Sequence, residues 1–231
     1  MRLNLSALLL SAVLSFCALN AAHAGTVVGN LDDGSGFSST VTSQSPSGTS
    51  PLWIAQQFTT GDLGSVTGLS QIIVSLGLFD PGNSNFFITG ELFADTGDAP
   101  GTKLLDLTRI DGLSETGFAN VAFNPGAAFD LASNTSYWFV IKGYSEDGSG
   151  NVDWEYANSD TPTSGTGSLS FFATSDDQGV TWTSTPVGGA DTPYLIQVST
   201  IPEPSSILIA AIGFSTVVGA ARVSRRRRQL A

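Results

Sequence analysis

Two carboxylates on one short segment are the residues best placed to do chemistry. Asp153 and Glu155 stand two apart, beside Trp154 and Tyr156. On a β-strand this spacing turns both carboxylates to one face. Such a pair can hydrolyse a glycosidic bond, as an acid and a base or nucleophile. Pairs also arise by chance among 20 acidic residues, and strand aromatics commonly pack in the core, so we expect no enzyme activity.

Histidine and cysteine chemistry is excluded from most of the chain. The only histidine is His23 and the only cysteine is Cys17, so residues 25–231 contain neither. Zinc and copper sites built on these ligands, catalytic triads and disulfides are therefore excluded there. We expect no cofactor.

One segment has the pattern S-x-D-x-G-x-T-W, from Ser175 to Trp182. It resembles the Asp-box hairpin of sialidases and other β-propellers. A sialidase would carry several copies and several arginines, whereas residues 25–201 contain one copy and one arginine, Arg109. We expect a structural hairpin, with an Asp that accepts backbone N–H bonds, a positive φ at Gly179, and Trp182 beneath the turn.

Oxygen-rich loops leave calcium as an alternative to plain solvated turns. Hard cations prefer carboxylate and amide oxygens, and extracellular modules bind calcium weakly. The loop residues concerned are Asp32, Asp33, Asp95, Asp98, Glu146, Asp147, Asn151, Asp153, Asp176 and Asp177. A weakly bound structural calcium ion is therefore kept as an alternative, and no dedicated metal site is predicted.

Aromatic residues suggest sugar binding as another option. Rings exposed on a sheet can stack on pyranose rings, while nearby polar side chains bind the hydroxyls. The candidates are Trp53, Trp138, Trp154, Tyr156 and Trp182. Each of them could instead belong to the core.

Short segments of alternating polarity must position these residues. In one of them Ile72, Val74 and Leu76 fall on one face, which is typical of a strand with one buried face. Strands are predicted at 53–59, 69–79, 88–93, 104–110, 118–123, 137–142, 152–156, 169–173 and 194–198, and a first strand plus a loose loop within 25–50. Turn-like sequences separate them at 80–83, 95–101, 124–126 and 146–151. About nine or ten strands predict an all-β fold, an antiparallel β-sandwich of jelly-roll type.

The predicted domain is strongly acidic. Residues 25–201 hold three basic residues, Lys103, Arg109 and Lys142, against nineteen acidic ones, a net charge of −16. Nucleic-acid binding needs a basic surface, so we expect none.

Both ends of the chain look like targeting segments. Arg2 precedes an apolar run from Leu3 to Leu19, and Ala22-His23-Ala24 then provides a small-residue cleavage site before Gly25. These are the parts of a secretory signal peptide. At the other end, 205–223 is an apolar stretch of about 28 Å as a helix, long enough to span a bilayer core.

The order of features at the carboxyl end is informative. Pro202-Glu203-Pro204 precedes the apolar stretch, and Arg225, Arg226, Arg227 and Arg228 follow it. This order resembles the PEP-CTERM sorting signal. The resemblance implies cleavage near Pro202-Glu203-Pro204 by a membrane protease of the exosortase type. The arginines are expected to stay on the cytoplasmic side, with the bulk of the protein outside.

Several internal segments resemble the choice-of-anchor family, in its R-type subgroup. They are 53–60, 95–101, 134–140, 153–156 and 194–198. The resemblance implies a β-sandwich domain that is carried to the surface by a sorting tail.

The sequence therefore predicts a signal peptide at 1–24, a β-sandwich domain at 25–201 and a sorting segment at 202–231. We expect a structural or adhesive protein of the cell surface or a biofilm matrix, with carbohydrate binding as the alternative. The expected partners are the export machinery, the sorting protease, the membrane before processing, and polysaccharide.

Overall fold

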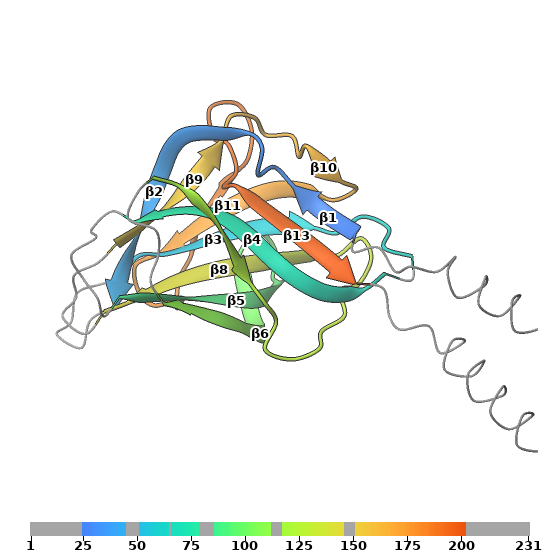
Figure 1. Ribbon diagram of the computed structural model, residues 1–231, viewed down its shortest axis with the longest axis horizontal. Helices are drawn as coiled ribbons and strands as arrows, with labels where there is room; N and C mark the ends of the chain where they lie inside the picture. The colour runs from blue at the N-terminus through green and yellow to red at the C-terminus, as the bar shows by residue number, and fades with distance from the viewer. Residues whose placement is uncertain are drawn as a thin grey trace, which may run out of the picture. The chain divides into compact units, whose positions relative to one another are not determined.

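Strands make up all the regular secondary structure of the described residues (Figure 1). The computed structural model describes residues 25–44, 51–64, 66–78, 86–111, 117–145 and 151–201. The predictions for 1–24, for 202–231, for the turn at 80–83 and for Glu146 and Asp147 lie outside these residues. Within the described ranges no helix has the length and apolar character needed to cross a membrane.

The described residues form thirteen strands, more than the nine or ten expected. They are β1 Gly25–Gly29, β2 Gly34–Gln44, β3 Trp53–Thr59, β4 Gly68–Leu78, β5 Phe87–Asp95, β6 Pro100–Asp111, β7 Ala119–Phe123, β8 Ser136–Tyr144, β9 Asn151–Ala157, β10 Ser164–Gly165, β11 Ser168–Ser175, β12 Thr183–Pro186 and β13 Ile196–Ile201. Strand β3 has the predicted bounds. The expected loose loop within 25–50 is wrong in part, because β2 extends through 34–44.

The strands form two antiparallel sheets. The first has the order β10-β1-β13-β4-β9-β2, with β7 also paired to β4. The second has the order β12-β11-β3-β8-β5-β6. Strand β2 also meets β8 in a short parallel contact, at Ser43 and Gln44, which links the two sheets at one corner.

A shared core joins the two sheets. Ile72, Val74 and Leu76 of β4 are buried in the same cluster as residues of β3, β5 and β8. The rings of Phe139 on β8 and Trp154 on β9 meet edge to face, with centroids 5.7 Å apart. Each large side chain that is fully buried in such a core contributes about 1.5–3 kcal/mol of hydrophobic stabilisation.

A second, smaller cluster covers the outer face of β3, β8 and β11. Its buried members are Trp53, Ala55, Trp138, Val140 and Ala173, and Phe93, Phe171 and Trp182 pack over them. Strand β8 is therefore buried on both faces, which corrects the expectation of one buried face drawn from its alternating pattern.

The two ends of the described domain lie side by side. The described residues from Gly25 to Ile201 belong to one compact unit. Gly25 at the start of β1 pairs with Thr200 near the end of β13, and Thr26 pairs with Ser199. Figure 1 shows β1 in blue beside β13 in orange-red.

Candidate functional site

Three of the predicted sugar-contacting tryptophans are buried. Trp138 and Trp154 are completely inaccessible, and Trp53 is 7% exposed. The indole N–H of Trp138 donates to Asp95, and that of Trp154 donates to the backbone carbonyl of Leu195. The prediction of glycan contact is wrong for Trp138 and Trp154, because their rings fill the two clusters and present no face to solvent.

Trp53 differs from Trp138 and Trp154 in the hydrogen bonding of its indole N–H. Its indole N–H is buried and has no hydrogen-bond partner within the described part of the chain. The ammonium group of Lys142 lies over the ring, 4.0 Å from its centroid. Lys142 also forms a buried ion pair with Glu91. These contacts give Trp53 a packing role on the outer face of the second sheet.

The predicted Asp-box hairpin is confirmed. The carboxylate of Asp177 accepts bonds from the Ser175 hydroxyl, the Thr181 hydroxyl and the Thr181 backbone N–H. Gly179 has φ +82°, and a Cβ there would lie 3.5 Å from the Trp182 ring. The bonds from Thr181 lower the pKa of Asp177 to about 2. Trp182 itself is half-buried.

The carboxylate pair has structural partners. Asp153 accepts a 2.6 Å bond from the Thr40 hydroxyl of β2. Glu155 accepts bonds from the Ser75 hydroxyl of β4 and from the Gly36 backbone N–H. Both side chains leave the face of β9 opposite to Trp154, as the spacing predicts. The two carboxylates tie β9 to its neighbours β2 and β4.

The acidic loops are organised by protein donors. Asp33 accepts bonds from the backbone and the hydroxyl of Ser159, and Asp32 accepts one from the Thr163 hydroxyl. Asp95 accepts bonds from Gln57 and Trp138. The described ranges contain no cluster of three or more acidic, histidine or cysteine side chains that could hold a metal ion.

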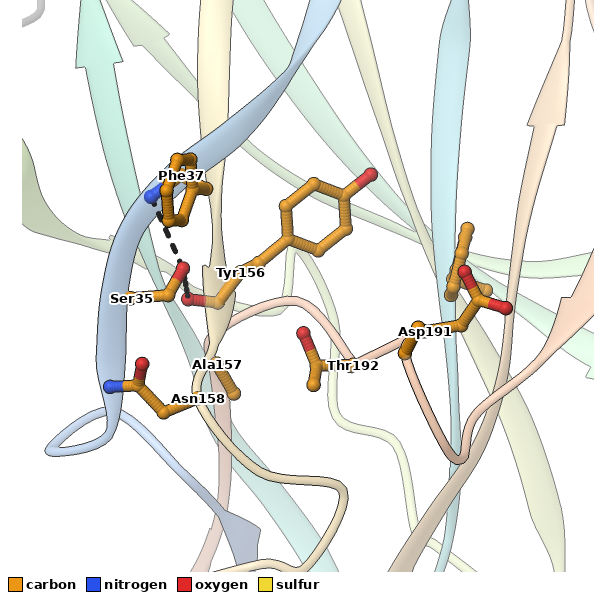
Figure 2. A pocket seen from close by; sticks show the side chains of 9 residues that line it. Ser35, Phe37, Tyr156, Ala157, Asn158, Asp191 and Thr192 are labelled. Carbon is orange, nitrogen blue, oxygen red and sulfur yellow. Dashed lines mark hydrogen bonds between the residues drawn. The ribbon is translucent and has the colours of Figure 1, made fainter.

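An open pocket of about 420 Å³ lies where β2 begins and β9 ends (Figure 2). Three aromatic residues line it: Phe37, Tyr156 and Phe172. The polar lining comes from Ser35, Asn158, Asp191 and Thr192. Such a combination of aromatic walls and a few polar groups is typical of a small-molecule site.

A stack of aromatic rings ends at Tyr156, one of the residues that line the pocket. Trp154 stacks on Tyr194, and Tyr194 stacks on Tyr156, each pair with centroids 4.6 Å apart. Phe172 meets both tyrosines edge to face. Burial raises the pKa of Tyr194 far above its ordinary value, so Tyr194 stays neutral. The stack thus runs from the fully buried Trp154 to Tyr156 at the pocket.

Hydrogen bonds position the polar side of the pocket. The Ser35 hydroxyl donates to the carbonyl of Tyr156 and accepts from the backbone N–H of Phe37. The amide of Asn158 donates to the Gly34 carbonyl. Within the described residues no hydrogen bond reaches the carboxylate of Asp191 or the hydroxyl of Thr192. These two groups are free to bind a ligand.

Of the residues predicted for sugar contact, only Tyr156 lines this pocket. Phe37, Phe172, Asn158 and Asp191 were missed, because they come from segments far apart in the sequence. One signal was present: Phe37 follows Gly34-Ser35-Gly36, where an isolated aromatic stands out in a polar stretch. The sorting residues Pro202, Glu203, Pro204 and Arg225–Arg228, and the cleavage residues Ala22 and Ala24, lie outside the described residues.

Fold and site together define an all-β domain of two packed sheets with an aromatic-lined pocket at one end. No protein-family model matches the chain, and no curated protein matches it.

Proposed function

We propose that this is an exported surface or matrix protein with a structural or adhesive role, sorted through its carboxyl end. A signal peptide at 1–24 directs export. The segment 202–231 holds the precursor in the membrane until an exosortase-type protease cleaves near Pro202-Glu203-Pro204. The domain between them is a jelly-roll-like β-sandwich that needs no cofactor and catalyses no reaction.

The observation that carries this proposal is the pairing of Gly25 with Thr200. Strand β1 begins at Gly25, the first residue after the proposed signal cleavage, and β13 ends at Ile201, the residue directly before Pro202. Both targeting segments therefore join the domain at one edge, where either can be removed without cutting a strand. Pro202 has no backbone N–H and cannot extend the ladder of β13.

The composition of the domain supports the same role. Without cysteine, its stability rests on the two packed clusters, which suits an extracellular environment where redox conditions vary. Its net charge of −16 keeps an exported protein soluble and disfavours nucleic acid.

The sorting step is tested by Glu203→Ala in the full chain, expressed in a host that contains the sorting protease. We expect the variant to stay in the membrane fraction at precursor size, because the recognition sequence is broken. Ser206→Ala, three residues further on, is the matched control and is expected to be released normally. Normal release of Glu203→Ala would contradict the proposal.

Carbohydrate binding is the second candidate function. The specific observation that favours it is the pocket lined by Phe37, Tyr156 and Phe172, rather than the tryptophans. In a matrix protein, such a site would provide the adhesive contact.

A further inference from the structure

We propose that the pocket binds one uncharged hexopyranose unit of a polysaccharide, stacked on the ring of Tyr156. This inference rests on the second candidate function and gives it a location, a ligand class and a mode of binding. It does not depend on the sorting step.

The ring stack provides the platform. Tyr194 covers one face of Tyr156, with the rings 18° from parallel, and Phe172 packs against its edge. Tyr156 is nevertheless only half-buried and lines the pocket. The surface that Tyr156 offers to a ligand is therefore the side turned away from Tyr194. A sugar ring there would become the fourth member of a stack that begins at Trp154.

The platform is rigid before any ligand arrives. The Tyr156 hydroxyl lies 3.1 Å from the Tyr194 hydroxyl, in hydrogen-bond contact, and the Tyr156 carbonyl accepts a bond from Ser35. A ring that is already held loses little conformational freedom when a ligand binds. This favours a flat, weakly polar ligand face such as the C–H face of a pyranose.

Phe37 supplies a second apolar wall. Its side chain is 76% exposed, the largest exposure of any described aromatic residue, although it borders the pocket. The Ser35 hydroxyl holds its backbone N–H at 3.1 Å, so the segment is ordered. Figure 2 shows Phe37 and the pair Asp191 and Thr192 on different sides of Tyr156. A ligand on Tyr156 would bury part of the Phe37 ring.

The polar groups match sugar hydroxyls. The Asp191 carboxylate accepts hydrogen bonds, and the Thr192 hydroxyl can donate or accept. The Asn158 amide oxygen is also open, because its NH₂ group is the part that bonds to Gly34. A pyranose unit carries several hydroxyls that can use such acceptors and donors together.

The charge of the site selects an uncharged sugar. Among the described residues that line the pocket there is no lysine or arginine, and Asp191 brings a negative charge into it. A uronic acid or a sulfated sugar would meet repulsion without a cationic partner. The volume of about 420 Å³ lies low in the range of about 300–1,000 Å³ for small-molecule sites, which suits a ligand as small as one hexopyranose unit.

The test is calorimetric titration of the full-length protein, held in a detergent without a sugar headgroup. Neutral oligosaccharides of glucose, galactose and mannose form one panel, and oligosaccharides of uronic acids form the other. We expect saturable binding to at least one neutral member and none to the uronates. No binding to any neutral member, or stronger binding to a uronate, would overturn the inference and leave the release assay of Glu203→Ala untouched.

Variants then locate the site. Phe37→Ala and Tyr156→Ala are expected to weaken binding at least about fivefold, the scale of one lost aromatic contact. Asp191→Asn should also weaken it, without loss of packing. Val180→Ala, an exposed apolar change on another turn, is the control with unchanged affinity. Tyr156→Ala removes a packed ring and can also destabilise the fold. The decisive variants are therefore Phe37→Ala and Asp191→Asn, which change exposed side chains. Unchanged affinity in both of them would overturn the assignment.

Discussion

At the scale of single residues, Asp177 shows how one carboxylate can hold a turn together. It accepts bonds from both ends of the turn between β11 and β12. The pKa of Asp177 falls from 3.8 to about 2, because the bonds from Thr181 favour the ionised form. A lowered pKa in the folded state means that the carboxylate stabilises the fold above about pH 4. This contribution is lost as the pH falls through about 2.

Asp177→Asn should therefore remove a stabilisation that depends on pH. We expect the thermal midpoint of the variant to lie below that of the wild type at pH 5. The gap should close between pH 4 and pH 2, because the wild-type carboxylate becomes protonated there. Thermal unfolding followed by circular dichroism across this range measures it. A gap of constant size would show that ionisation of Asp177 does not stabilise the turn.

Lys142 is the second residue whose charge is structural. Its ammonium group forms an ion pair with Glu91, and the two side chains are only 8% and 12% exposed. Lys103 also approaches Glu91, at 3.6 Å, but its own side chain is 46% exposed. Removing one partner of a buried pair leaves a charge in the interior without full compensation.

We expect Lys142→Met to lower the free energy of unfolding by about 2–3 kcal/mol, somewhat less than for a fully uncompensated charge, since Lys103 remains near Glu91. Lys103→Met is the matched control and should cost about 1 kcal/mol or less, as an exposed pair does. Urea unfolding of both variants gives the comparison. Equal costs would mean that burial of the pair adds nothing.

The candidate site could be predicted only in part at this scale. Tyr156 was found because it stands beside Trp154 and the two carboxylates. Asp191 and Phe172 carry no local pattern that marks them, since their role depends on the end of β9, the middle of β11 and residues 190–192 lining the same pocket. Trp138 was misassigned because an alternating strand pattern does not reveal that a second cluster covers its outer face.

At the scale of elements, the turn between β11 and β12 depends on Gly179. Its φ of +82° disfavours any residue with a side chain, and an added Cβ would lie 2.8 Å from Cζ3 of Trp53. Gly36 has a similar φ of +72°, but open space surrounds the position of its Cβ. Substitutions at the two glycines therefore distinguish the cost of backbone strain alone, at Gly36, from the cost of strain combined with a steric clash, at Gly179.

Gly36→Ala should cost about 1–2 kcal/mol, the strain of a left-handed backbone alone. Gly179→Ala should cost about 1–3 kcal/mol more, because the turn must also move away from Trp53. Chemical denaturation of the two variants measures the difference. If they lose the same stability, then the contact with Trp53 does not constrain the turn.

Alternation predicted the strands that bury one clear apolar row, such as β4 with Ile72 and Val74. It missed β2, whose residues are mainly Gly, Ser and Thr; of the β2 side chains that the structure describes, only Val41 lies in the core. That strand is held by its pairing with β9 and by bonds such as Thr40 to Asp153. The short strands β10 and β12 lie at sheet edges and were missed for the same reason. Pairing with a distant partner leaves little trace in a local sequence.

At the scale of the whole molecule, the acidity of the chain and the absence of cysteine from residues 25–201 were readable from the sequence alone. The antiparallel sheets followed from the number of short segments and turns. Which strands are neighbours was not readable, because β1 and β13 come from opposite ends of the domain. That pairing, absent from any local pattern, carries the proposed mode of sorting.

The pairing of Gly25 with Thr200 also has a mechanical meaning. Tension applied through both termini would peel β1 from β13 one rung at a time, instead of shearing all the rungs together. A precursor held at both termini would therefore unfold at a low pulling force. If the proposed signal peptide is removed, only the carboxyl end stays attached, and tension no longer acts across the pairing of β1 with β13.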